Sequence, residues 1–365
     1  MMAWLVQSEA AVSAGKARMA HKSRMAVRLW FRLITGLLFF MLAPPKSISV
    51  EHTHHPANNH KTTIKLKKHY PAIRDHANPT MQKMLEQHIA SLHLSSAIRD
   101  KRLAVALVDV TDPSAPSMAQ VNGDEMMYAA SMPKIAILLA AFERIAAGKL
   151  PLDNDLRKTM TSMIRHSSNK AATKMIRKVG GNYINKVLES PKYKLYDPNH
   201  NGGLWVGKEY AGGQAFHRDP LHNLSHGATA MQTARYYYLL ETGQLVSPKY
   251  SHEMKDILSK PGISHKFVKG LEASHYSDLQ MYRKSGTWRT YHADSALIEH
   301  DGRRYIAVAL ARDPKGGQWM KKLIHEMDAI IVSLHAHDAD VASIDASASL
   351  ASAEPQQSSS AKRLM

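Results

Sequence analysis

Three short strings in the middle of the chain carry side chains that could act together on a carbonyl group. The strings are Ser131-Met-Pro-Lys134, Ser167-Ser-Asn169 and Lys284-Ser-Gly-Thr287. A serine hydroxyl becomes a good nucleophile when a neighbouring base takes its proton. A lysine can be that base when burial or a nearby cation lowers its pKa. The strings therefore predict nucleophilic catalysis by a serine that is assisted by lysine.

The context of Ser131 selects it as the nucleophile. The S-x-x-K pattern occurs four times, beginning at Ser13, Ser131, Ser167 and Ser359. At Ser131 the pattern opens a strongly apolar run, residues 135–147, which has helical character. Ser131 and Lys134 would lie one turn apart on the same face of that helix. We expect Lys134 to be the base, and the structural alternative for Ser131 is a simple helix N-cap.

The second and third strings supply candidates for proton transfer. Lys284 is a second cation that could lower the pKa of Lys134, and Ser167 could hand a proton to a leaving amine. Asn169 could hold a substrate amide, although an asparagine at a helix start is equally well explained as an N-cap. Ser167 and Lys284 also have structural alternatives. Ser167 could be a simple turn residue, and Lys284 could be a lysine on an edge strand that deters aggregation.

The residues after Lys284 are small enough for a substrate backbone to approach them. Ser285, Gly286 and Thr287 continue a predicted strand, and glycine in a strand often marks such an approach. We expect these three residues to bind substrate. The backbone N–H groups of Ser131, at a helix N-terminus, and of Thr287 are candidates for an oxyanion hole.

Hydrophobic periodicity and turn residues predict the elements that position these strings. Predicted helices cover residues 80–94, 135–147, 156–164, 171–179, 228–240, 248–258 and 323–334. Predicted strands cover residues 103–110, 118–121, 280–288, 294–299 and 304–311. Segment 190–225 is rich in glycine and long for a loop, and such loops are usually functional or disordered. We expect it to form a wall of the site.

The strings and their order resemble those of the class A β-lactamase and penicillin-recognising serine hydrolase family. The likeness spans about residues 81–332 and includes segments 128–153 and 228–245. It implies a mixed α/β (α+β) fold, in which an antiparallel sheet domain flanked by helices carries an inserted all-helical domain. It also implies catalytic roles for Ser131, Lys134, Ser167 and Lys284, and substrate binding by Asn169, Ser285, Gly286 and Thr287.

Two departures from the family pattern concern the hydrolysis of an acyl-enzyme. The family's β-lactamases carry an E-x-x-L-N string whose glutamate activates the deacylating water, and residues 180–228 contain no such string. Glu209, Asp197 and Asp219 are the other possible bases. The interval from Ser131 to Ser167 is also short, which predicts a trimmed helical domain. We therefore expect acylation to occur and β-lactam turnover to be poor.

Three further residues are candidates for binding a substrate carboxylate. Arg283, Arg289 and His292 lie near Lys284 in the sequence. The direction of the strand decides which of them would face the site, and the sequence leaves that open.

The chain divides into four predicted parts. Residues 1–45 resemble a signal peptide or an N-terminal anchor, because four basic residues precede an apolar run at 33–43. That run is shorter than the ~20 residues that span a bilayer. Met25 is a possible true start. Residues 46–78 are expected to be a basic, histidine-rich linker, residues 79–335 the hydrolase domain, and residues 336–365 a disordered tail.

The composition narrows the possible chemistry. The chain has no cysteine, which excludes disulfides, thiolate catalysis and cysteine zinc sites. The net charge is +17, and residues 1–69 contribute 11 basic and 2 acidic side chains, or +9. Because the remaining charge is spread over a long domain, we expect no nucleic-acid partner, but membrane or cell-wall association through the basic N-terminal segment is possible. We expect no cofactor and no dedicated metal site, although the histidines at 52, 54, 55 and 60 resemble a metal-binding tract.

These features predict an exported serine hydrolase, periplasmic, secreted or membrane-anchored. It would form an acyl-enzyme on an amide, lactam or peptide, with a β-lactam or a peptidoglycan-like molecule as its substrate, and act as a weak β-lactamase or a peptidase-type amidohydrolase. The alternative is a non-catalytic cell-wall-binding or accessory protein on the same scaffold. Nucleic-acid binding through the basic N-terminal segment is a third option.

Overall fold

The computed structural model describes residues 70–352. The predicted signal peptide or anchor, the linker up to residue 69 and residues 353–365 lie outside this range. None of the helices within it has both the length and the apolar character of a membrane span.

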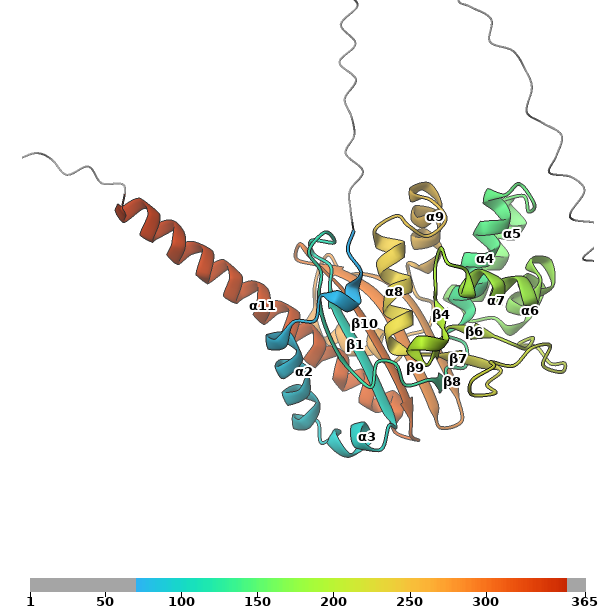
Figure 1. The fold of residues 1–365 in the computed structure, drawn as a ribbon, viewed down its shortest axis with the longest axis horizontal. Helices are drawn as coiled ribbons and strands as arrows, with labels where there is room; N and C mark the ends of the chain where they lie inside the picture. Colours follow the sequence, from blue (N-terminus) through green and yellow to red (C-terminus); the bar gives the residue numbers. More distant parts are fainter. Residues whose placement is uncertain (1–69, 353–365) are drawn as a thin grey trace, which may run out of the picture. The chain divides into compact units, whose positions relative to one another are not determined.

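A five-stranded antiparallel sheet forms the centre of the described domain (Figure 1). Its strand order is β2-β1-β10-β9-β8, which places β8 at an edge. The strands are β1 (Leu103–Asp109), β2 (Ser117–Val121), β8 (Gln280–Trp288), β9 (Tyr291–His300) and β10 (Arg303–Arg312). The predicted mixed fold with an antiparallel sheet is confirmed.

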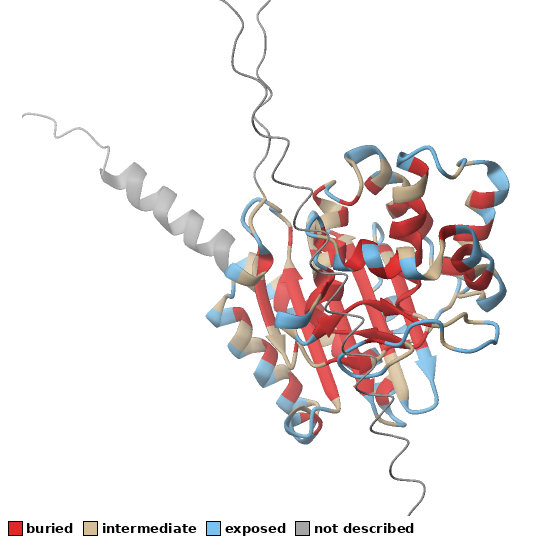
Figure 2. Cartoon of the chain, turned by 45° about the vertical axis from the view of Figure 1, so that its right-hand side comes forward, coloured by how far each residue is buried: buried red, intermediate tan, exposed pale blue. Residues whose placement is uncertain are grey.

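Helices cover both faces of the sheet, and Figure 2 shows the strands between them as buried. On one face lie α2 (Pro79–Ser91), α3 (Ser95–Arg99), α10 (Phe267–Leu271) and α11 (Gly316–Ser352). On the other lies α8 (Ala230–Glu241), followed by α9 (Pro248–Leu258). Strand β1 is buried on both sides because alternate residues enter the two hydrophobic cores. Its continuous apolar sequence reflects this position.

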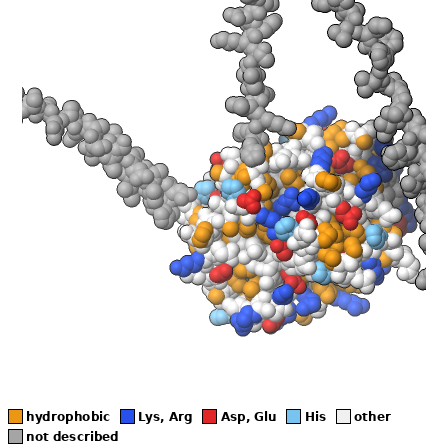
Figure 3. Space-filling model, viewed as in Figure 1, with side chains coloured by type: hydrophobic (Ala, Val, Ile, Leu, Met, Phe, Trp, Pro, Cys, Tyr) orange, Lys and Arg blue, Asp and Glu red, His pale blue; other side chains and the backbone are white. Residues whose placement is uncertain are grey.

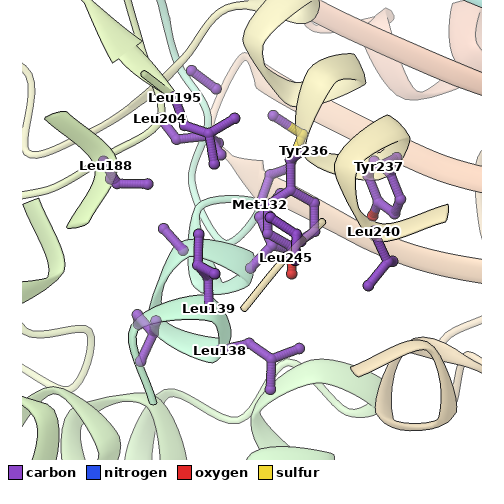
Figure 4. Close-up of a cluster of buried hydrophobic side chains, with 14 of the residues drawn as sticks. Met132, Leu138, Leu139, Leu188, Leu195, Leu204, Tyr236, Tyr237, Leu240 and Leu245 are labelled. Atoms are coloured by element: carbon purple, nitrogen blue, oxygen red, sulfur yellow. The ribbon is translucent and has the colours of Figure 1, made fainter. Parts of the chain in front are cut away.

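A group of helices is inserted between the strands of the sheet. It consists of α4 (Lys134–Ala146), α5 (Asn154–Arg165), α6 (Asn169–Val179) and α7 (Gly181–Glu189). Ten of the side chains of α4 are buried, so this helix is a central core element. Figure 4 shows Leu138 and Leu139 of α4 among side chains from α7, α8 and the segment around Leu204. The burial of α4 therefore fixes the position of the turn at its N-terminal end.

Short strands anchor the predicted loop 190–225. A three-stranded sheet pairs β3 (Met127–Tyr128) with β7 (His226–Ala228) and β7 with β6 (Trp205–Val206). A second ribbon pairs β4 (Tyr196–Asp197) with β5 (Gly202–Gly203). Because β3 directly precedes Ala129, the first sheet ties the middle and the C-terminal end of the loop to the turn that carries Ser131.

The ends of the domain differ from the sequence expectation. Helix α11 continues to Ser352, so residues 336–352 of the predicted disordered tail are helical. Their alanine-rich composition was interpreted as disorder, although alanine is the best helix former. Residues 70–78 belong to the domain and not to the linker, because Ile73 is buried and Arg74 pairs with Asp124 at 2.9 Å. Within residues 70–352 there are also three 3₁₀ turns: η1 (Ile73–Asp75), η2 (Pro198–His200) and η3 (Glu272–Ser274).

Strand β8 lies unusually close to the turn before α4. A Cβ atom added to Gly286 would lie 2.2 Å from the Ala129 carbonyl oxygen and 2.7 Å from the Ser131 backbone nitrogen. Both contacts are with backbone atoms, which cannot rotate away. Only glycine allows this approach, as the sequence suggested for this position.

Replacement of Gly286 by alanine is expected to lower the free energy of unfolding by about 1–3 kcal/mol, because the strand and the turn must separate. Urea unfolding measures this change. Gly317→Ala in α11 is a matched control, since its new Cβ would meet only side-chain atoms, the nearest at 3.3 Å on His292. An equal loss of stability in both variants would contradict the packing argument.

Candidate active site

Ser131 lies in the turn between β3 and α4. Helix α4 starts at Lys134, and no side chain caps it, so the N-cap interpretation of Ser131 is wrong. The preceding residue, Ala130, has a left-handed backbone (φ 51°), which costs energy for a residue with a Cβ atom. The hydroxyl of Ser131 accepts a hydrogen bond from Lys134 Nζ at 3.0 Å.

Lys134 is fully buried and has neutral oxygen atoms as its hydrogen-bond partners. Beside Ser131, its Nζ donates to the Ser167 carbonyl at 2.6 Å and to Asn169 Oδ1 at 2.8 Å. The ring of Tyr210 lies over the same nitrogen, 4.5 Å away. Among the described residues no carboxylate pairs with it. Burial lowers the pKa of Lys134 to about 7, so the side chain can accept a proton near neutral pH.

The hydroxyl of Ser167 joins the two lysines. Lys284 Nζ donates to Ser167 Oγ at 2.9 Å, and Lys134 Nζ lies 3.4 Å from the same oxygen. Burial holds the pKa of Lys284 well below its ordinary value, and the charge of Lys134 lowers it further. Ser167 has a left-handed backbone (φ 54°), as Ala130 does. Two sequence-distant lysines thus converge on the neighbourhood of Ser131.

Asn169 faces the site and does not cap its helix. Ser168 is the N-cap of α6, and its hydroxyl accepts from the Ala171 backbone N–H at 3.1 Å. The N-cap alternative for Asn169 is therefore wrong. The Asn169 side chain bonds Lys134 instead and lines the cavity described below.

Two residues that sequence reasoning missed support the strand of the third string. His265 Nε2 lies 3.0 Å from Ser285 Oγ. Lys266 Nζ donates to the Gly286 carbonyl at 2.6 Å and to Thr287 Oγ1 at 2.9 Å. Burial lowers the pKa of Lys266 to about 8. Both lie in an irregular segment before α10, where neither periodicity nor a motif marks them.

The three candidates for binding a carboxylate lie elsewhere. Arg283 is buried and forms an ion pair with Asp294 at 2.6 Å. Arg289 lies over the ring of Trp288, 5.6 Å from its centre. His292 packs against Gly316 at the start of α11. None of the three lines the cavity around Ser131.

An open cavity of about 320 Å³ gives access to Ser131. It is lined by Tyr128, Ala130, Ser131, Asn169, Lys208, Glu209, Tyr210, Ser225, His226, Thr287 and Trp288. Segment 190–225 thus forms one wall, as expected. Thr287, a candidate oxyanion donor, shares the cavity with Ser131, and Gly286 brings its strand against the Ser131 backbone nitrogen. The buried Lys284, Ser285 and Gly286 lie behind this surface.

Aromatic rings make up much of the cavity wall. Tyr210 stacks against His226 with ring centres 4.1 Å apart, and its hydroxyl donates to the Ala130 carbonyl at 3.2 Å. Burial lowers the pKa of His226 to about 4, so this ring is neutral. Trp288 is 55% exposed at the rim. No pattern in the sequence places Tyr210 over Lys134.

The three candidate bases for deacylation are engaged elsewhere. Glu209 lines the cavity, but its carboxylate accepts two hydrogen bonds from Arg177, at 2.8 and 2.7 Å, which lower its pKa. Asp219 is buried and accepts from the Tyr196 hydroxyl. Asp197 caps η2. None is free to activate a water in this arrangement.

The described residues contain no cluster of three or more histidine, aspartate or glutamate side chains that could hold a metal ion. The histidine-rich tract 52–60 lies outside them.

Comparison with known proteins identifies the family of the chain. A family model for the β-lactamase enzyme family matches residues 84–159 and 153–334. No curated protein matches the chain by sequence.

Solved structures with the same fold are distant in sequence. A β-lactamase from Sphaerobacter thermophilus is 16% identical with a TM-score of 0.53, and the match covers 66% of this chain and 97% of that one. A class A β-lactamase from Bacteroides cellulosilyticus is 16% identical with a TM-score of 0.54, covering 71% and 100%. PBP-A is 17% identical with a TM-score of 0.52, covering 71% and 97%. A mutant of PBP-A is known as an acyl-enzyme complex with penicillin G. Because the family model covers most of the sequence, this chain belongs to the β-lactamase enzyme family.

Proposed function

We propose that the protein is an exported serine hydrolase that forms an acyl-enzyme on an amide, lactam or peptide substrate through Ser131. The observation that carries the proposal is the 3.0 Å contact between Ser131 Oγ and a buried lysine that has no carboxylate partner among the described residues. Such a lysine is neutral often enough to act as a base. The β-lactam of the PBP-A complex supports a β-lactam or a related peptide as the substrate.

The proposed acylation moves one proton from the serine to the leaving amine. Lys134 takes the Ser131 proton as Oγ bonds to the substrate carbonyl carbon. The backbone N–H groups of Ser131 and Thr287 stabilise the oxyanion. As the carbon–nitrogen bond breaks, Ser167 gives its proton to the nitrogen and regains one from the Lys134 ammonium, 3.4 Å away. Lys284 fixes the Ser167 hydroxyl and adds positive charge.

Export is the part of the proposal that rests on the sequence alone. Four basic residues precede the apolar run 33–43, which is typical of a signal peptide. The periplasm or the cell exterior would bring the protein to β-lactams and peptidoglycan, and the basic segment would favour association with a membrane or cell wall.

Labelling with a fluorescent penicillin tests the nucleophile. The wild-type protein is expected to form a covalent adduct, and Ser131→Ala is expected to lose it by at least about a thousandfold in rate. Ser359→Ala removes the serine of another S-x-x-K pattern and is the matched control. Equal labelling of Ser131→Ala would overturn the proposal, and no adduct on either protein would favour the non-catalytic cell-wall-binding alternative.

The rate of acylation is expected to rise with pH and to level off above the Lys134 pKa of about 7. Below that value the protonated lysine cannot accept the serine proton, so each pH unit should lower the rate about tenfold. The second-order rate constant for penicillin labelling, measured between about pH 5 and about pH 8, checks this. A flat profile would show that Lys134 is not the base.

Hydrolysis of the acyl-enzyme is expected to be slow because Glu209 is held by Arg177 and no other carboxylate lines the cavity. Nitrocefin should give a burst of about one equivalent followed by a much slower steady rate. Intact mass spectrometry should find the adduct long after mixing. Rapid, sustained nitrocefin hydrolysis would contradict this prediction and leave the acylation proposal intact.

A further inference from the structure

A second cavity, of about 570 Å³, lies along the outer side of α6. It is lined by Lys170, Thr173, Lys174, Arg177, Lys178, Glu209, Ala211, Gly212 and Gly213. We call this cavity the α6 groove. One wall is the helix, and the other is the loop that follows Glu209.

The α6 groove carries a strong excess of positive charge. Four of its lining side chains are cationic and one is anionic. Lys174 is paired with Asp155 at 3.0 Å and Arg177 with Glu209, whereas Lys170 and Lys178 make no hydrogen bond or ion pair within residues 70–352. Figure 3 shows basic and acidic side chains interspersed over the face that it draws. The groove is therefore suited to anionic groups.

The charges are regularly spaced and the opposite wall is held in place. Lys170, Lys174 and Lys178 are four residues apart on one helix, so their side chains neighbour one another in a row. Thr173 Oγ1 accepts from the Ala211 backbone N–H at 2.9 Å, which fixes the loop to the helix. Gly212 has φ 128° and open space around its Cβ position, so this wall is bare backbone.

The α6 groove continues from the cavity around Ser131. Glu209 lines both. Asn169 lines the first cavity and Lys170, the next residue, lines the groove. A substrate whose carbonyl carbon lies at Ser131 can therefore extend along α6.

We propose that the α6 groove binds the acidic side chains of a peptide substrate whose scissile bond lies at Ser131. This inference rests on the proposed function, because a chain that continues from an amide carbonyl is a peptide and its anionic groups are carboxylates. Lysine side chains are flexible point charges that bind successive carboxylates without a fixed geometry. The exposed backbone at Gly212 can hydrogen-bond the peptide main chain.

Binding of a fluorescein-labelled hexaglutamate peptide to the full-length Ser131→Ala protein tests the groove without acylation. Fluorescence anisotropy should show binding that weakens with salt, and hexaglutamine should bind far less. Lys170→Glu combined with Lys178→Glu is expected to weaken hexaglutamate binding by about tenfold or more. Lys83→Glu combined with Lys322→Glu makes the same change in net charge on α2 and α11 and should leave binding nearly unchanged.

Equal loss in the two double variants would overturn the proposal, since binding would then follow net charge. An oligothymidylate that binds the groove as tightly as hexaglutamate, with the same loss in Lys170→Glu/Lys178→Glu, would overturn the assignment to a carboxylate chain. Penicillin labelling of Lys170→Glu/Lys178→Glu in the protein that retains Ser131 separates the two proposals. If this protein takes no label, while the Ser131→Ala protein binds hexaglutamate and loses that binding in the double variant, the proposed acylation fails and the groove still binds an acidic chain.

Discussion

Two buried ammonium groups share one hydroxyl, and the rest of the described structure accommodates this arrangement. Lys134 and Lys284 both approach Ser167 Oγ, and no carboxylate of residues 70–352 lies within hydrogen-bonding distance of either. Desolvation and mutual repulsion make the doubly protonated state costly, so one of the two lysines is readily neutral. Burial of Lys134 supplies the base next to Ser131, and the charge of Lys134 lowers the pKa of Lys284 further, so like charge is crowded at this point. The fold must therefore hold α4 and β8 together against it.

Several features supply that restraint. Helix α4 is buried almost all round, and Lys134 at its start has no exposed surface. Strand β8 is fixed behind the site by the Arg283–Asp294 pair and by Lys266, which binds two groups on the strand. The two cations, Arg283 and Lys266, outnumber the single aspartate beside them, Asp294. The positive field that remains would favour the negative charge that develops on a carbonyl oxygen during attack.

The sequence predicted best those parts of the fold that depend on local pattern. The three-residue spacing of Ser131 and Lys134 sufficed to predict their contact, although Ser131 precedes the helix and does not lie on it. The strand 280–288 was found with its observed bounds. The approach of Lys284 to Ser167 came from the family resemblance, because no local pattern reports a contact across more than a hundred residues. His265, Lys266 and the position of Tyr210 depend on how irregular segments fold back on the site, and such segments lack periodicity. The length of α11 was missed because alanine and serine together suggest disorder as readily as helix.

The burial of α4 has a consequence for the chain before it is fully folded. Helix α4 has 13 residues, which is too short for a stable isolated helix in water, and Lys134 has an ordinary pKa while it is in water. Ser131 therefore becomes reactive only when the native packing that buries Lys134 forms. A partly folded chain would carry an inert serine, so acylation by other electrophiles before folding is complete would be avoided.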